Sequence, residues 1–107
     1  MFLAVWSFIN EGDEAMFANP GYVCGWAPNV LLSGGRMVYV PAKEERKFRI
    51  DPNDVEDNIT KRTKMILIST PDNPTGAVLN KSDLERIAEL AIKHDLIVVF
   101  DESFEKI

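Results

Sequence analysis

Two short apolar runs, with a helical pattern between them, most constrain the fold of this chain. Residues 65–68 and 96–100 contain only apolar side chains and lack the polar alternation of a half-buried strand. Such runs are typical of strands that are buried on both faces of a parallel sheet. A strand, a helix and a second strand form a βαβ unit, so we expect the chain to belong to the α/β class.

The segment between the two runs predicts an amphipathic helix. Residues 82–85 read Ser-Asp-Leu-Glu, a capping box that predicts a helix beginning there. The expected apolar face repeats at helical spacing and consists of Leu84, Ile87, Ala88 and Ala91. The single histidine, His94, falls in the last turn, where an imidazole favours the negative end of the helix dipole. No cysteine or second histidine is available as a further metal ligand beside His94, so we expect no metal site.

The rest of the chain predicts further strands and helices. The expected strands lie at residues 14–18 and 37–40, and the expected helices at residues 2–9, at 26–33 with Pro28 in its first turn, and after the N-cap pair Asp51-Pro52. Strands that alternate with helices predict a mostly parallel sheet with flanking helices. Because so few helices would not cover both faces of the sheet, we expect exposed apolar surface or self-association.

Size, charge and cysteine content narrow the possible functions. With 107 residues, the chain has the size of one small domain, and we expect residues 1–107 to contain no second domain. The net charge of −5 argues against nucleic acid and membrane surfaces as partners. The most basic stretch, residues 43–49, is interrupted by two glutamates and is expected to be a solvated loop. Cys24 is alone, which excludes an intrachain disulfide and fits a cytoplasmic location; no segment resembles a signal peptide or a membrane span.

Three side chains follow expected strands and are candidates for ligand contact, because ligands of α/β sheets bind at the carboxyl ends of the strands. Asp101 either caps the following turn or pairs with a cation such as a protonated heterocycle nitrogen, since an unpaired carboxylate is costly at a dry edge. Asn73, whose backbone is restricted by Pro74, is either a turn residue or a donor to a ligand. Tyr22 either packs on the neighbouring helix or lies against a flat ligand.

Taken together, these residues resemble a known arrangement. Residues 70–76 read Thr-Pro-Asp-Asn-Pro-Thr-Gly, similar to the motif Ser-Pro-Asn-Asn-Pro-Thr-Gly, and residues 101–106 resemble Asp-Glu-x-Tyr-Glu-Lys. Residues 10–14, 19–22 and 33–41 match further turns of the same family. On these motifs the chain is identified as a member of the class I/II aminotransferases, the fold-type-I pyridoxal-phosphate enzymes related to aspartate aminotransferase. The resemblance implies that residues 1–107 are an incomplete part of the large, cofactor-binding domain.

The resemblance also implies roles for individual residues toward pyridoxal 5′-phosphate. Asp101 would pair with the pyridinium nitrogen, Asn73 would donate to the phenolic oxygen, and Tyr22 would stack on the ring. Phe104 stands where the family usually has a tyrosine, so the phenolic oxygen would have one donor fewer. Asp72 replaces the first asparagine of the motif and is expected to alter the local turn more than the chemistry.

The same resemblance implies that the catalytic residue is absent from this chain. The family's Schiff-base lysine lies well downstream of the Asp-Glu-x-Tyr motif, and Lys106 does not correspond to it. A covalent mechanism needs its nucleophilic amine, so we expect the isolated chain to have no transaminase activity. The parent enzyme would be a homo-oligomer that transfers an amino group between an amino acid and a 2-oxo acid.

Two alternatives remain open at this point. A pyridoxal-phosphate-dependent carbon–sulfur lyase or decarboxylase can share every motif seen here, because reaction type depends on the whole site. A non-catalytic module that self-associates through exposed sheet surface is the alternative from another class. A nucleotide-binding domain is disfavoured, since no glycine-rich phosphate motif follows any expected strand.

Overall fold

The computed structural model describes residues 2–106, and each of the expected helices and strands is present there. In chain order the elements are α1 (Phe2–Phe8), β1 (Glu14–Asn19), α2 (Val23–Leu32), β2 (Arg36–Pro41), the 3₁₀ helix η1 (Glu44–Arg46), α3 (Pro52–Asn58), β3 (Thr63–Ser69), α4 (Lys81–His94) and β4 (Ile97–Asp101). Helices therefore alternate with strands along the chain, as the sequence predicts.

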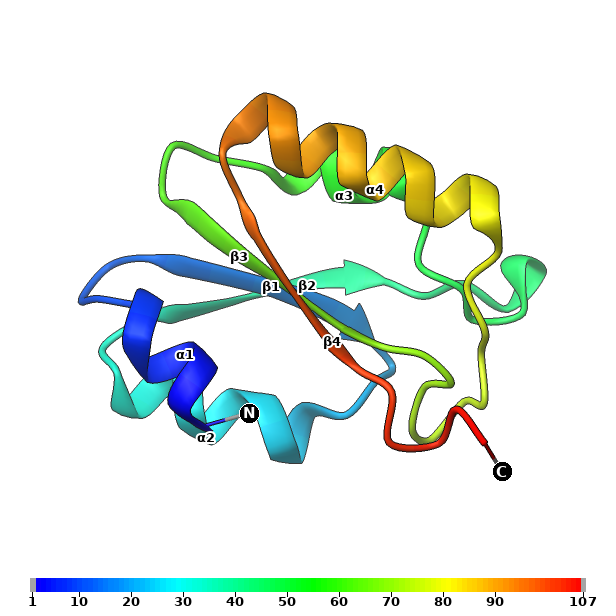
Figure 1. Cartoon of the computed structure of the whole chain (residues 1–107), viewed down its shortest axis with the longest axis horizontal. Helices are drawn as coiled ribbons and strands as arrows, with labels where there is room; N and C mark the ends of the chain where they lie inside the picture. The colour runs from blue at the N-terminus through cyan, green and yellow to red at the C-terminus, as the bar shows by residue number, and fades with distance from the viewer. Residues whose placement is uncertain (1, 107) are drawn as a thin grey trace.

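The four strands form one parallel sheet in the order β2-β1-β3-β4, which confirms the predicted α/β fold class. The crossover that follows β1 leads to β2 on one side, whereas the crossover that follows β3 leads to β4 on the other side. Figure 1 shows α1 and α2 below the sheet and α3 and α4 above it. The strand order therefore reverses between β1 and β3, and open α/β sheets bind their ligands at the carboxyl ends of the strands that flank such a switch point.

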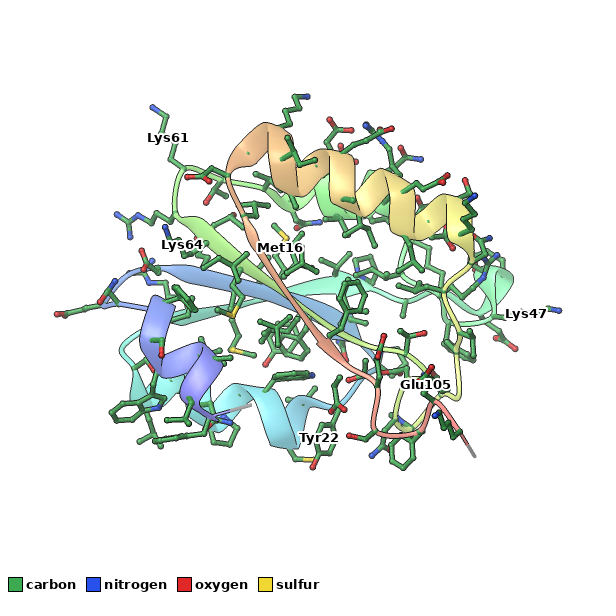
Figure 2. The ribbon with its side chains drawn as sticks, in the orientation of Figure 1. Met16, Tyr22, Lys47, Lys61, Lys64 and Glu105 are labelled. Atoms are coloured by element: carbon green, nitrogen blue, oxygen red, sulfur yellow. The ribbon has the colours of Figure 1, made fainter. Side chains whose placement is uncertain are left out.

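Alternate residues of the central strands divide between two apolar cores. Met16 and Ile66 pack toward α3 and α4, and Figure 2 shows Met16 between the sheet and this helical layer. Phe17 and Leu67 pack toward α1 and α2, where they meet the buried Trp26. The expectation that so few helices would not cover both faces of the sheet is wrong for β1 and β3, because two helices on each face suffice to cover two central strands.

Apolar surface nevertheless remains exposed, as the sequence predicts. Leu3 of α1 and Leu32 of α2 are 76% and 70% exposed, and Ile92 of α4 is 83% exposed. The edge strand β4 is only half-buried, and its Phe100 lines an open hollow between β4 and α4. The exposed apolar surface thus lies on the outer sides of the helices and beside β4 rather than over the centre of the sheet.

Helix α4 begins one residue before the expected capping box. The side chain of Asn80 accepts a hydrogen bond from the Asp83 backbone N–H at 2.8 Å, so Asn80 is the N-cap and the assignment to Ser82 is wrong. Ala88 is exposed, and Leu90 is buried in its place. His94 lies in the last turn, as expected.

Helix α2 also begins earlier than expected. The Tyr22 carbonyl accepts hydrogen bonds from the Gly25 and Trp26 backbone N–H groups, both at 3.3 Å, so the helical turn forms before Trp26. Val23 is therefore the first helical residue, and Pro28 lies inside the helix instead of in its first turn. The earlier start places Tyr22 at the N-terminus of the helix, shortly after the end of β1 at Asn19.

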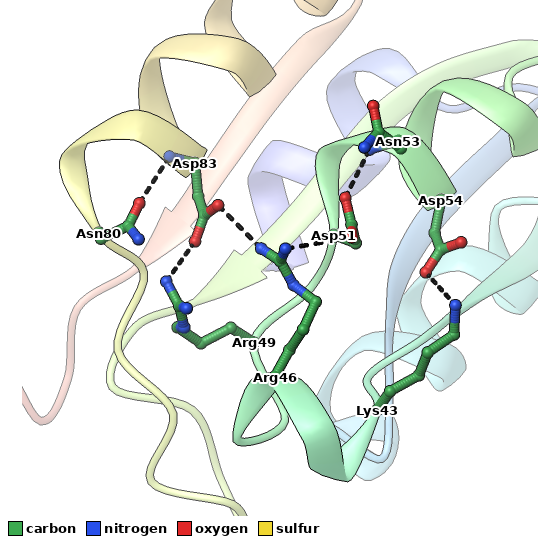
Figure 3. Close-up of polar contacts among 8 residues, drawn as sticks. All are labelled: Lys43, Arg46, Arg49, Asp51, Asn53, Asp54, Asn80 and Asp83. Atoms are coloured by element: carbon green, nitrogen blue, oxygen red, sulfur yellow. Dashed lines mark hydrogen bonds and ion pairs between the residues drawn. The ribbon is translucent and has the colours of Figure 1, made fainter.

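The basic stretch at residues 43–49 is a solvated loop only in part. Arg46 and Arg49 donate to the two carboxylate oxygens of Asp83 at 2.9 and 2.8 Å (Figure 3). Asp83 is 7% exposed, and its charge is neutralised by these two arginines. Arg46 also contacts Asp51, the N-cap of α3, at 3.1 Å. The ion pairs tie this loop to the first turns of α3 and α4.

Candidate functional site at the carboxyl edge of the sheet

A pocket of about 190 Å³ lies at the carboxyl ends of the strands and brings together all four residues that the sequence singles out. Tyr22 reaches it from the loop after β1, Asn73 from the loop after β3, and Asp101 and Phe104 from the end of β4. Residues far apart in the chain therefore share one small pocket, as the parallel topology requires. Their roles toward a cofactor stay predictions.

The carboxylate of Asp101 is held by the turn that follows β4. One of its oxygens, Oδ1, accepts a hydrogen bond from the Ser103 backbone N–H at 3.0 Å and a second, short one from the Ser103 hydroxyl. The turn-capping alternative considered for Asp101 is therefore observed. Both of these bonds go to Oδ1, and no hydrogen bond from the described residues reaches Oδ2, which can therefore contact a group in the pocket.

The end of β3 is hydrogen-bonded to Asp101 as well. The Thr70 backbone N–H donates to the Asp101 carbonyl at 3.1 Å, which continues the β3–β4 pairing by one bond. Ser69 is the direct neighbour of Asp101 in the register of the two strands. Paired residues of a parallel sheet point to the same face, so the side chains of Ser69 and Asp101 both face the layer that contains Tyr22.

Ser69 is a site residue that the sequence analysis did not single out. It lines the pocket, and its hydroxyl oxygen is buried without a hydrogen-bond partner among the described residues. Buried polar groups are normally hydrogen-bonded, so an orphan hydroxyl next to a carboxylate fits a pocket that receives a polar molecule. No sequence signal identifies Ser69, because its place opposite Asp101 is known only from the register of the two strands.

Tyr22 is half-buried and stands at the N-terminus of α2, on the α1–α2 side of the sheet (Figure 2). Its ring lies against Gly25, where an added β-carbon would be 2.0 Å from Tyr22 Cε1. One helical turn further on, Trp26 is buried in the core beneath it. Glycine at position 25 is therefore required for this placement of the ring.

Asn73 lies in a tight turn that internal hydrogen bonds define. The Gly76 backbone N–H donates to the Asp72 carbonyl at 2.8 Å, and the Thr75 hydroxyl donates to the Asp72 carboxylate at 2.7 Å. Burial raises the pKa of the Asp72 carboxyl, while the hydrogen bond from Thr75 acts in the opposite direction. Asn73 itself is half-buried in the pocket wall.

Phe104 lies at the mouth of the pocket and is 42% exposed. It also borders a neighbouring open hollow with Asn73 and Pro74.

No lysine belongs to the described residues that line the pocket. Residues 2–106 hold no cluster of three or more histidine, cysteine or acidic side chains suited to a metal ion. None of the described helices combines the length and the apolar composition that a bilayer crossing needs.

A doubly wound parallel sheet that gathers a carboxylate, an amide and an aromatic ring at its carboxyl edge is typical of α/β domains that bind ligands. Residues 2–107 match the profile of the family described as aminotransferase class I and II. The chain belongs to this family.

Individual relatives agree with this assignment. The chain is 44% identical over 99 residues to an aspartate aminotransferase from Pyrococcus abyssi, a match that covers 92% of this chain. It is similar to the crystal structure of an aromatic aminotransferase from Pyrococcus horikoshii, with a TM-score of 0.90, 42% identity and 94% of this chain covered. An aminotransferase structure from Escherichia coli aligns over 99% of this chain with a TM-score of 0.93 and 39% identity.

The matches cover only part of each relative. The chain spans 25% of the Pyrococcus abyssi protein, 27% of the Pyrococcus horikoshii structure and 26% of the Escherichia coli structure. The chain therefore corresponds to about a quarter of each of these relatives.

Proposed function

We propose that this chain provides the ring-binding part of a pyridoxal 5′-phosphate site in an aminotransferase. The parent enzyme would transfer an amino group between an amino acid and a 2-oxo acid. The observation that carries the proposal is the single pocket in which Tyr22, Asn73 and Asp101 meet. The family membership and the aminotransferase names of the relatives favour this reaction over carbon–sulfur cleavage or decarboxylation.

Asp101 is the residue with the most specific role in this proposal. A carboxylate with one oxygen held by Ser103 can direct the other to a single partner, and a half-buried anion is stabilised when that partner is cationic. A protonated ring nitrogen is such a partner. When bound, pyridoxal phosphate supplies the electron sink for amino-group chemistry, and the protein orients it and adjusts its charge.

The other pocket residues would position the ring. The amide of Asn73 can donate a hydrogen bond to the phenolic oxygen, and the flat face of Tyr22 can cover one side of the ring. The Ser69 hydroxyl, which is buried and has no partner among the described residues, would contact the ligand only after turning toward the pocket. Phe104 has no hydroxyl and would contribute apolar contact alone.

The isolated chain is proposed to bind without catalysing transamination. Lys47, Lys61 and Lys64 project from the surface in Figure 2, and none of the pocket-lining residues is a lysine. No described lysine is therefore placed to act as the nucleophile or as the base for a proton shift. The lone Cys24 supports a reducing, cytoplasmic location for the parent enzyme.

The test expresses the complete coding region that contains this chain. We expect the purified protein to take up pyridoxal phosphate with a new visible absorbance band and to transaminate amino acids. The Asp101→Ala variant should bind the cofactor at least about tenfold more weakly, because it loses a charge-assisted contact. Asp57→Asn, which removes an exposed charge of α3 outside the pocket lining, is the matched control.

Two results would contradict the proposal. One is a complete protein that binds no pyridoxal phosphate, and the other is an Asp101→Ala variant whose affinity equals that of Asp57→Asn. The 107-residue chain by itself should show no turnover of amino acid with added cofactor. A turnover that Asp101→Ala abolishes would contradict that part of the proposal.

Self-association is a second candidate function, favoured by the exposed apolar side chains on α1 and α2. Besides Leu3 and Leu32, these include Phe2, Trp6, Phe8 and Leu31. Exposed apolar patches of this kind mark protein interfaces. Sedimentation of the 107-residue chain over a concentration series, beside a titration of cofactor absorbance, separates the two functions. Tight association without any cofactor signal would favour the self-associating module.

A further inference from the structure

We propose that Ser103 is a positioning residue that orients the Asp101 carboxylate toward the ring nitrogen of the cofactor. This inference rests on the proposed function, because it needs a ligand whose nitrogen contacts Asp101. Ser103 occupies the variable position of the Asp-Glu-x-Tyr motif, and the motif gives that position no role.

The geometry of the carboxylate carries the inference. Two donors of Ser103, its backbone N–H at 3.0 Å and its hydroxyl, meet the same oxygen of Asp101. Rotation of the carboxylate about its bond to the β-carbon would break both hydrogen bonds at once. Asp101 and Ser103 both line the pocket, so the carboxylate is fixed with its second oxygen available to the ligand.

The backbone on both sides of this contact is held independently of the Ser103 hydroxyl. The Thr70 N–H donates to the Asp101 carbonyl at 3.1 Å, and the Glu105 N–H closes the turn by donating to the Glu102 carbonyl at 2.9 Å. A residue without a hydroxyl at position 103 keeps its backbone donor and the turn. The hydroxyl can therefore be removed to test orientation separately from folding.

The contact gains importance when the pocket is filled. Ser103 is exposed in the structure, so water can replace its hydroxyl as a donor to Asp101 while the pocket is open. A bound ring excludes water from this side, and an oriented hydrogen bond is stronger in such surroundings. We therefore expect loss of the hydroxyl to weaken ligand binding while leaving the stability of the ligand-free protein unchanged.

The experiment uses the complete protein and two noncovalent probes. Pyridoxamine 5′-phosphate has no aldehyde and forms no bond with surface lysines, and its analogue with C–H in place of the ring nitrogen cannot pair with Asp101. Affinities are measured by calorimetry for the wild type, Ser103→Ala and Ser103→Thr, and melting temperatures are measured without ligand. We expect Ser103→Ala to bind pyridoxamine phosphate about tenfold more weakly, the loss of one hydrogen bond to a charged group.

The comparison of the two probes decides the outcome. The analogue should bind Ser103→Ala and the wild type equally, and Ser103→Thr should restore the affinity for pyridoxamine phosphate. Equal weakening of both probes, or no weakening of either, would overturn the positioning role while leaving the proposed function intact. A wild-type protein that does not distinguish the two probes, or binds neither, would overturn the proposed function and this inference with it.

Discussion

The ring of Tyr22 rests on Gly25, so closely that a β-carbon at position 25 would lie 2.0 Å from Tyr22 Cε1. A helix interior normally favours alanine over glycine by about 1 kcal/mol. Gly25 thus occupies a position where helix stability alone would favour a larger residue. The contact links the start of α2 to the pocket, since Tyr22 lines the pocket and Gly25 lies behind its ring.

Gly25→Ala should therefore weaken cofactor binding without lowering stability. The added methyl group displaces the Tyr22 ring, and loss of its stacking contact should reduce the affinity of the complete protein for pyridoxamine phosphate about three- to tenfold. The free energy of unfolding should stay the same or rise. Cys24→Ala, at the exposed neighbouring position of the same helix, is the control and should leave affinity unchanged. Equal affinities of the two variants would contradict the importance of this contact.

Asp83 should be among the most sensitive charged positions for stability. Asp83→Ala leaves Arg46 and Arg49 without their shared carboxylate, and both arginines are only partly exposed. We expect a loss of about 1–3 kcal/mol in the free energy of unfolding, measured by urea denaturation, after allowance for solvent screening of the arginines. Glu85→Ala, which removes the exposed pair with Lys81, should cost less than about 0.5 kcal/mol. Equal losses of unfolding free energy in both variants would show that the ion pairs of Asp83 stabilise the protein no more than an exposed ion pair does.

The two candidate N-caps of α4 can be compared directly. Asn80→Ala removes the hydrogen bond to the Asp83 N–H and should cost about 1 kcal/mol of unfolding free energy. Ser82→Ala lies within the first turn, where the side chain is exposed, and should change stability by less than about 0.5 kcal/mol. Chemical denaturation of both variants measures the difference. A larger loss for Ser82→Ala would restore the capping box that the sequence suggests.

Asp72 should make stability depend on pH in the opposite sense to a salt-bridged carboxylate. Burial raises the pKa of the folded Asp72 carboxyl above its ordinary value of 3.8, so its contribution to stability is complete below that pH and is lost as the pH rises through the raised pKa. Asp72→Asn keeps an oxygen that can accept the Thr75 hydrogen bond and cannot ionise.

Urea denaturation of wild type and Asp72→Asn between about pH 4 and about pH 7 measures this effect. The variant should gain stability relative to the wild type as the pH rises. Asp57→Asn removes an exposed carboxylate of the same charge and should give a difference that changes little with pH. A flat difference for Asp72→Asn as well would show that its carboxyl titrates normally in the folded protein.

The local elements could be predicted from the sequence because their signals are short-range. The apolar run at residues 65–68 and the pair Asp51-Pro52 each depend on neighbours within a few positions, and both are found where expected. The starts of α2 and α4 were misplaced. In each case a group outside the expected helix, the Tyr22 carbonyl or the Asn80 side chain, satisfied the first N–H groups.

The residues of the candidate site could also be proposed from short-range signals in the sequence. Tyr22, Asn73 and Asp101 each follow a strand, and parallel strands bring their carboxyl ends to one edge. Ser69 was not found, because a serine at a strand end has no distinctive pattern and its significance depends on its neighbour in β4. The ion pairs of Asp83 with Arg46 and Arg49 were missed because Asp83 lies more than thirty positions from either arginine in the sequence.

The order of apolar runs, turns and caps along the chain by itself determined that a parallel α/β sheet would form and which strand ends would carry polar side chains. Only the tertiary structure decided which oxygen of Asp101 is held by the turn, that Tyr22 rests on Gly25, and that the hydroxyl of Ser69 has no partner within residues 2–106. The physical reason is the distance along the chain between the residues that interact. Strand and helix preferences arise from adjacent residues, whereas hydrogen-bond partners and ring contacts depend on side-chain positions that exist only once the strands have paired.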